Sequence, residues 1–294
     1  MKTSYKIIAI FGTLVLAVIV LVVVFNSRRP VLILADHSFM RLYGVERTRN
    51  EANRASRALF RPIKVVIIAD GVGDDIIQIA ITDTSSNPFC VLFPFRFLSS
   101  AIIYHEHNPD VRVVILEGRD SQDSERLANL SGYFIYKTDI SADFYRAGIA
   151  ASELSLDYHG KIAIFLEPGI EVQAREAFLR ALNDQGKLME TYFFTSFSEF
   201  PEIPGLSIAV LAGVGLEFLN ENPGVPAILF SWFEPFLIPS DVVLVINDSP
   251  LAQAVQAVSM VSAGTENGSI RSNFIALDKA RISGRLLRKI QKSQ

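Results

Sequence analysis

The chain has 294 residues, half of them hydrophobic, and a formal net charge of −3. Setting aside the four basic residues at positions 2, 6, 28 and 29 leaves 24 basic against 31 acidic residues, and so acidic a surface argues against nucleic-acid binding. The one cysteine, Cys90, excludes an internal disulfide and is expected to be a buried thiol within an apolar run.

Residues 7–25 form a run of nineteen residues in which Thr13 is the only polar side chain. At about 1.5 Å per residue, a helix of this length just crosses a hydrocarbon core of roughly 30 Å. The exit from the run, VVVFNSRRP, is a poor cleavage site and offers no cysteine for a lipid. We therefore expect residues 1–29 to be an uncleaved signal anchor in the inner membrane. The short charged tail before the run favours a cytoplasmic N-terminus, with the remaining chain in the periplasm.

After this run, short apolar stretches alternate with amphipathic ones, which is typical of βαβ units and a parallel sheet. In the first half we expect strands at residues 31–35, 63–69, 90–93 and 111–116. Between them we expect a long polar helix that Arg61 and Pro62 end, a helix beginning at Asp74, and a helix at residues 97–104.

Residues 133–182 show the pattern of strand, helix, strand and helix, and we interpret them as the passage from one half of the fold to the other. Thr138 or Ser141 can cap the first of these helices, whose apolar face begins at Phe144. The strand expected at residues 162–166 is apolar on both faces, as in a parallel sheet that helices cover on both sides.

The second half repeats the alternation, with strands expected at residues 191–195, 207–211, 227–230, 242–246 and 273–277. A helix is expected at residues 250–263 and a basic amphipathic helix at residues 280–291. The pattern predicts two doubly wound parallel-sheet α/β domains behind an N-terminal transmembrane helix. We assign residues 30–138 and 250–275 to the first domain, and residues 139–249 and 276–294 to the second.

Three short motifs accompany this architecture: Asp36-His37-Ser38-Phe39 after the first strand, Asn108-Pro109-Asp110, and Phe144-x-x-x-Gly148-x-x-Ala151. The two domains resemble a type I periplasmic binding protein. The motifs are similar to those of the basic membrane protein group of nucleoside-binding lipoproteins, with Met40 standing where that group has asparagine. The resemblance implies that the domains close on a small polar ligand, a nucleoside or a sugar, and hand it to an ABC-type permease.

Ligands of open parallel sheets bind beyond the carboxyl ends of the strands. In this chain the rule selects seven candidate ligand-binding residues: Asp36, Ser38, Phe39, Arg96, Glu117, Trp232 and Asp248. Phe39 and Trp232 suit the aromatic walls of a cleft, the alternative for both being the core. Asp36 and Asp248 would accept hydrogen bonds from hydroxyl groups or an amine, or else cap helices and turns. Arg96 suits a carboxylate or phosphate, or a simple ion pair.

No motif in the sequence supports catalysis, a metal site or a cofactor, so we do not expect an enzyme. His105 and His107 lie two residues apart on an expected helix and point to different sides, which favours a solvated pair. Gly71-Val72-Gly73 follows a strand, but the dinucleotide-binding pattern G-x-G-x-x-G fails at Ile76. We interpret that segment as a tight turn.

Two functional hypotheses follow. The first is a membrane-anchored periplasmic solute-binding protein that binds a nucleoside or sugar in an inter-domain cleft for transport or sensing. The second, motivated by Met40 and by an apolar anchor in place of a lipid, is a ligand-free binding-protein fold that acts as a scaffold or interaction subunit of an envelope complex. The aromatic residues at 193–200 and 230–236 are either a contact surface or the core of the second domain.

Overall fold

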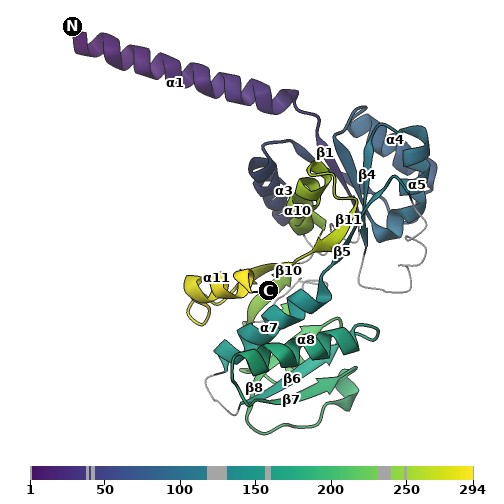
Figure 1. Cartoon of the computed structure of the whole chain (residues 1–294), viewed down its shortest axis with the longest axis vertical. Coiled ribbons are helices and arrows are strands. Elements are labelled where there is room, and N and C mark those ends of the chain that lie inside the picture. The colour runs from purple at the N-terminus through teal and green to yellow at the C-terminus, as the bar shows by residue number, and fades with distance from the viewer. Residues whose placement is uncertain are drawn as a thin grey trace.

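The computed structural model describes residues 2–37, 40, 44–117, 131–155, 160–230, 240–247 and 250–293, with no side chain described at positions 2–12, 47, 117 and 250. Helix α1 (Lys2–Ser27) leads into the first strand and projects from one end of the molecule (Figure 1). Its large apolar side chains between Leu14 and Val24 are 41–62% exposed. Among the residues whose side chains are described, which begin at Thr13 in α1, no helix combines the length and the apolar character needed to cross a membrane.

Among the described residues, the first domain is a six-stranded parallel sheet in the order β11-β5-β4-β3-β1-β2. Its strands are β1 (Val31–Asp36), β2 (Ile63–Ile68), β3 (Cys90–Pro94), β4 (Arg112–Glu117), β5 (Phe134–Thr138) and β11 (Asn267–Ile270).

Two hydrophobic cores flank this sheet because successive side chains of a strand point to opposite faces. Val31 and Ile33 of β1 lie in the core beneath α3 (Val45–Leu59) and α10 (Pro250–Ser262). Leu32 and Leu34 lie in the core beneath α4 (Asp74–Thr84) and α5 (Leu98–His107). Cys90 is fully buried at the start of β3, and burial raises the pKa of its thiol to about 12. The thiol therefore stays protonated at neutral pH, as expected of a core residue.

The second domain, over the residues described, is also six-stranded, in the order β12-β10-β9-β8-β6-β7. Its strands are β6 (Lys161–Leu166), β7 (Glu190–Phe194), β8 (Leu206–Ala212), β9 (Ala227–Phe230), β10 (Val242–Asn247) and β12 (Asn273–Ala276). Strand β12 runs antiparallel to β10, whereas the other neighbouring strands are parallel. Helices α7 (Ile140–Leu154), α8 (Glu171–Asp184) and α11 (Gly284–Lys292) cover one face and the short α9 (Phe218–Glu221) the other.

The aromatic run of the second domain packs inward. Phe165 of β6 contacts four other phenylalanine rings at centroid distances of 5.4–6.2 Å: Phe194, Phe197, Phe200 and Phe218. Phe197 lies in the 3-10 helix η3 (Phe197–Glu199), which turns the run back over β6. The phenylalanines of residues 193–200 therefore pack against the core of the second domain, while residues 231–236 lie outside the described part of the chain.

The predicted fold class of two doubly wound parallel α/β domains is confirmed. The sequence pattern missed β11, a four-residue strand containing Gly268, because it is too short and polar for an apolar-run signal. It also placed residues 250–275 in the first domain, whereas β12 pairs with β10 in the second sheet. The basic helix starts at Gly284 instead of residue 280, because the Ser283 hydroxyl caps it by accepting a hydrogen bond from the Leu286 amide at 3.2 Å.

Candidate ligand-binding cleft

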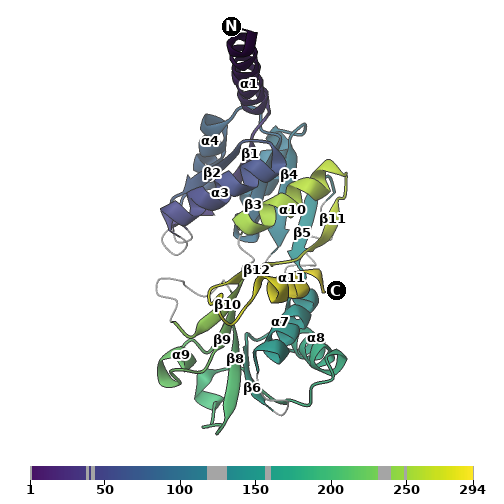
Figure 2. The same cartoon turned by 90° about the vertical axis from the view of Figure 1, so that its left-hand side faces the viewer.

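The carboxyl ends of the two sheets face each other (Figure 2). Strand β5 leaves the first sheet for α7 of the second domain, and β10 leaves the second sheet for α10 of the first. A third crossing, at Arg271 and Ser272, joins β11 to β12. Since ligands of parallel sheets bind at the carboxyl ends, the two facing edges are the candidate binding region.

At the edge of the first sheet, the structure brings two predicted site residues together. Asp36 ends β1, and Arg96 lies in the 3-10 helix η1 (Phe95–Phe97) that follows the neighbouring strand β3. Their side chains form an ion pair in which the carboxylate is 11% exposed and the guanidinium 47%. The guanidinium also lies 5.3 Å from the centre of the Phe97 ring. In a charged pair of this kind, the carboxylate can accept hydrogen bonds from a polar ligand and the guanidinium can donate hydrogen bonds to it.

A cavity of about 630 Å³ adjoins this pair, between the β2–α4 turn and the start of α5. Gly71 in the turn has φ 76°, a conformation that favours glycine, and Gly73 precedes α4. The Asp74 carboxylate accepts hydrogen bonds from the hydroxyls of Ser99, at 3.0 Å, and Ser100. In the cavity wall the chain turns at Asp70 and Gly71, one residue earlier than predicted, and the Asp74 carboxylate that follows ties α4 to α5.

The edge of the second sheet contributes a residue that the sequence analysis missed. Asn247 ends β10, is only 2% exposed, and its amide donates a 3.3 Å hydrogen bond to the Glu51 carboxylate on α3 of the first domain. A cavity of about 270 Å³ between the domains is lined by both of these residues together with parts of α10 and β12. The signal that could have found Asn247 is a polar residue closing an otherwise apolar strand at the carboxyl edge.

The crossing segments are held by buried polar contacts. The Gln253 amide on α10 donates to the Thr138 hydroxyl at 2.9 Å, where the chain leaves the first domain. In the second domain, the Asp143 carboxylate on α7 pairs with Arg146. It also accepts hydrogen bonds from the backbone amide of Ser272, at 3.1 Å, and from the Ser272 hydroxyl. Burial raises the pKa of Asp143, while Arg146 and the Ser272 hydrogen bonds act to lower it. These contacts hold the crossing segments at the points where the chain passes between the domains.

The other sequence-predicted site residues stay predictions. Glu117 ends β4 at the same edge as Asp36, but its side chain is not described. Ser38, Phe39, Trp232 and Asp248 lie outside the described residues.

The two histidines that end α5 do not behave as a matched solvated pair. The His105 ring packs against the Tyr133 ring at 4.5 Å between ring centres and 55° between planes, and the buried Nδ1 atom of His105 has no hydrogen-bond partner among the described residues. His107 instead contacts the Ile103 carbonyl oxygen through Nδ1 at 2.8 Å. Among the described residues, no three side chains of histidine, cysteine, aspartate or glutamate lie close enough together to hold a metal ion.

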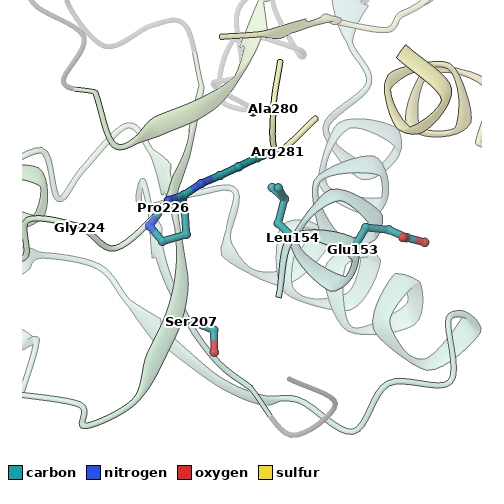
Figure 3. A pocket seen from close by; sticks show the side chains of 7 residues that line it. All are labelled: Glu153, Leu154, Ser207, Gly224, Pro226, Ala280 and Arg281. Carbon is teal, nitrogen blue, oxygen red and sulfur yellow. The ribbon is translucent and has the colours of Figure 1, made fainter. Parts of the chain in front are cut away.

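Figure 3 shows a third cavity, of about 560 Å³. It borders the end of α7 and the amino ends of β8 and β9, and the Arg281 side chain extends across it toward Pro226. Arg281 is already paired with Asp278 at 3.4 Å. Because this cavity lies at the amino ends of the strands, it is separate from the candidate cleft at their carboxyl ends.

No protein-family model matches the chain, and no curated protein matches it either. Solved structures share its fold at low sequence identity. A solute-binding protein of an ABC transporter system from Conexibacter woesei DSM 14684 is 13% identical, with a TM-score of 0.59 over 90% of this chain and 94% of that one. A periplasmic solute-binding protein from Actinobacillus succinogenes 130z with bound D-allose is 11% identical, with a TM-score of 0.54 over 89% of this chain and 100% of that one.

A transcriptional activator of the comK gene from Bacillus halodurans is 12% identical, with a TM-score of 0.55 over 90% of this chain and 95% of that one. Two of these proteins are solute-binding proteins, and the third is a transcriptional activator. The chain therefore has the type I periplasmic binding protein fold.

Proposed function

We propose that this protein binds a small polar ligand, a sugar or a nucleoside, between its two domains. The observation that carries the proposal is the facing of two parallel sheets by their carboxyl edges, with Asp36 and Arg96 paired at one edge and Asn247 closing the other. The sugar in the similarly folded protein from Actinobacillus succinogenes supports the choice of a polyhydroxylated ligand.

The chemistry of the described residues suits such a ligand. The Asp36 carboxylate, oriented by Arg96, accepts hydrogen bonds from hydroxyl groups, and the exposed part of the guanidinium donates to ring or hydroxyl oxygens. Ser38, Phe39, Glu117, Trp232 and Asp248 remain proposed members of the site. A ligand that touches both edges only when the domains approach stabilises the closed state by its differential contacts.

The proposal includes a membrane anchor at residues 7–25 and a periplasmic location. Its support is the apolar sequence of that run and the exposure of every large apolar side chain described between Leu14 and Val24. So long an exposed apolar surface is stable only when lipid or another protein covers it. An anchored binding protein of this kind delivers its ligand to an ABC-type permease or reports its presence.

Native mass spectrometry of the full chain in detergent, followed by release and identification of any bound molecule, tests the proposal. We expect one sugar or nucleoside per chain, or a rise in unfolding temperature when a panel of both is added. An empty protein that no member of the panel stabilises would contradict ligand binding.

One observation favours a second candidate function, a ligand-free scaffold subunit of an envelope complex. The polar groups at the facing edges already have partners within the chain, since Asp36 pairs with Arg96 and Asn247 with Glu51. A site that satisfies its own polar groups has less to gain from a ligand. Affinity capture from crosslinked membranes by the full chain, together with an empty cleft in mass spectrometry, would favour the scaffold.

A further inference from the structure

Four arginines gather at the amino edge of the first sheet, where α1 meets the domain. Arg28 and Arg29 directly follow α1, Arg61 precedes β2, and Arg112 begins β4. We call these four residues the arginine cluster. Arg28, Arg29 and Arg112 are exposed, and Arg61 is half-buried. Because these residues lie at or just before the starts of β1, β2 and β4, the cluster is at the end of the domain opposite the carboxyl edge.

The partners of the arginine cluster are backbone oxygens and aromatic rings. Arg29 donates to the carbonyl oxygens of Asn87, at 3.4 Å, and Pro88, at 2.6 Å, and Arg61 donates to the carbonyl oxygen of Arg29 at 2.7 Å. The guanidinium groups of Arg61 and Arg112 both lie over the Phe89 ring, at 3.9 and 4.9 Å from its centre.

Within the described residues, no carboxylate forms an ion pair with any member of the cluster. The positive charges act on one another instead: burial and the nearby Arg28, Arg29 and Arg112 lower the pKa of Arg61. Since the chain beyond residue 29 carries a net charge of −7 by sequence, from 24 basic and 31 acidic residues, this concentration of positive charge at one end makes the domain strongly polarised.

An exposed aromatic residue lies beside the cluster in an unusual conformation. Phe60 closes α3 with φ 47° and ψ 47°, the left-handed region, and is the one non-glycine residue with positive φ in the described part of the chain. Its ring is 36% exposed, contacts Phe25 of α1 at 5.7 Å, and lies 4.9 Å from the Arg28 guanidinium. Such a conformation is strained for a bulky residue and persists where the surroundings require it. Here it presents an aromatic ring at the end of the apolar helix.

The connection between α1 and the domain is short and tethered. Only residues 28–30 separate Ser27 from Val31. The Pro30 carbonyl accepts a hydrogen bond from the Phe89 amide at 2.7 Å, and the Val31 amide donates to the Pro62 carbonyl at 2.9 Å. With the side-chain bonds of Arg29, these contacts hold the amino edge of the sheet at the end of the helix.

We propose that the arginine cluster is a membrane-docking surface that binds the anionic headgroups of the bilayer in which α1 is anchored. The inference rests on the anchoring part of the proposed function, and its support is the cluster's charge complementarity to anionic lipid and its continuity with the exposed apolar helix. Phe60 and Phe25 then lie at the level of the headgroups.

Docking by this surface fixes the orientation of the protein. The first domain stands on the bilayer by its amino edge, its carboxyl edge points away from the membrane, and the second domain is the distal one (Figure 2). A connection of three residues, numbered 28–30, lets the domain move little from this position.

The test uses the full chain in a nonionic detergent with mixed micelles that hold equal amounts of phosphatidylglycerol and phosphatidylcholine. Native mass spectrometry counts each lipid on the protein. Because each guanidinium near an anionic surface raises affinity about fivefold, we expect the wild type to prefer phosphatidylglycerol by about tenfold or more. Added salt should reduce the preference.

The test variant is Arg28→Gln/Arg112→Gln, since both side chains are exposed and make ring contacts without hydrogen bonds that the fold needs. The matched control is Arg175→Gln/Arg180→Gln on α8, which removes the same charge from two exposed guanidiniums that also lie over aromatic rings, at 4.5 and 5.0 Å. We expect the first variant to lose about tenfold or more of the preference and the control to keep it. Far-UV circular dichroism checks that both variants are folded.

Equal lipid preference in the two variants, or no preference in the wild type, would overturn the docking surface. A third outcome would also overturn it. If a stoichiometric amount of a soluble polyanion such as heparin binds the wild type and abolishes its lipid preference, the cluster is a polyanion site. Anchoring is measured separately, by flotation of all three proteins with vesicles of phosphatidylcholine alone. Failure to float contradicts the anchor whatever the lipid preference shows.

Discussion

Two aspartate–arginine pairs in this protein have the same chemistry and opposite surroundings. Asp143 and Arg146 on α7 are 2% and 3% exposed, whereas Asp36 and Arg96 at the first sheet edge are 11% and 47% exposed. The buried pair also receives two hydrogen bonds from Ser272, so its polar groups are satisfied within the fold. The exposed pair keeps a guanidinium half in solvent, where a ligand can reach it.

These surroundings distinguish the pair that stabilises the fold from the pair that is open to a ligand. Taking two charges out of water costs more than their attraction returns unless further hydrogen bonds compensate, and removing one partner then leaves a buried charge. An exposed pair contributes about 0–1 kcal/mol and tolerates exchange of partners. The buried pair therefore joins α7 to the third crossing, and the exposed pair is available for recognition.

Replacement of the buried arginine has the largest expected effect. Arg146→Met keeps most of the side-chain volume but leaves the Asp143 carboxyl unpaired, and we expect a loss of about 3–5 kcal/mol in the free energy of unfolding by urea. The double variant Asp143→Asn/Arg146→Met removes both charges and should recover part of that loss. If the single and double variants are equally destabilised, packing and not charge is the cause.

Removal of the Ser272 hydroxyl has the next largest effect. Its hydrogen bond to the Asp143 carboxylate is charge-assisted and buried, so Ser272→Ala should cost about 1.5–3 kcal/mol. Ser259→Ala is the control, because the Ser259 hydroxyl is exposed and bonds only to the Val255 carbonyl within α10. A Ser272→Ala variant as stable as the control would show that the third crossing does not depend on this contact.

The sequence predicted the strands and helices of the two domains better than the contacts of the crossing segments. Runs such as residues 162–166 are apolar on both faces, and this pattern identifies a strand in a covered parallel sheet without any tertiary information. Asp143 and Arg146 gave no such signal, because a charged pair three residues apart on a helix is usually solvated. The pair is buried because Ser272, which lies 129 residues from Asp143 along the chain, packs against it.

The candidate site was predicted in part. The rule for carboxyl ends selected Asp36 and Arg96, which the structure brings together, but it could not state that they pair with each other. It missed Asn247, since an asparagine that ends a strand is also a common turn residue and its contact with Glu51 depends on how the domains approach. Residues on loops beyond the strands are set by tertiary contacts that no periodicity encodes.

A moderate effect is expected from the glutamine that holds the third crossing to the first domain. The Gln256 side chain donates to the Arg271 carbonyl at 2.6 Å and accepts from the Arg271 amide at 3.3 Å. Gln256→Ala removes two neutral hydrogen bonds, so we expect a loss of about 1–2 kcal/mol in denaturant unfolding. The exposed Gln173 on α8 supplies the control Gln173→Ala, which should change stability by less than about 0.5 kcal/mol. If the two variants lose equal stability, Gln256 does not hold the third crossing to the first domain.

The smallest effect on stability, and the largest on binding, is expected from Arg96. Arg96→Gln breaks an ion pair whose guanidinium is 47% exposed, so the free energy of unfolding should fall by about 1 kcal/mol or less. The same change leaves the Asp36 carboxylate without the cation that orients it, and removes a charged donor to the ligand. Affinity for whichever sugar or nucleoside the wild type binds should therefore fall about tenfold or more in calorimetric titration.

The contrast between the two pairs depends on Arg96→Gln behaving differently from Arg146→Met. A loss of stability as large as that of Arg146→Met would mean that Asp36 is as dependent on its arginine as Asp143 is, and that the first sheet edge is framework too. Unchanged affinity in a stable Arg96→Gln protein would instead move the ligand away from this edge, toward the cavity between the domains where Asn247 meets Glu51. Asn247→Ala would then be the variant that loses binding, because the buried Asn247 amide lines that cavity at the carboxyl end of β10.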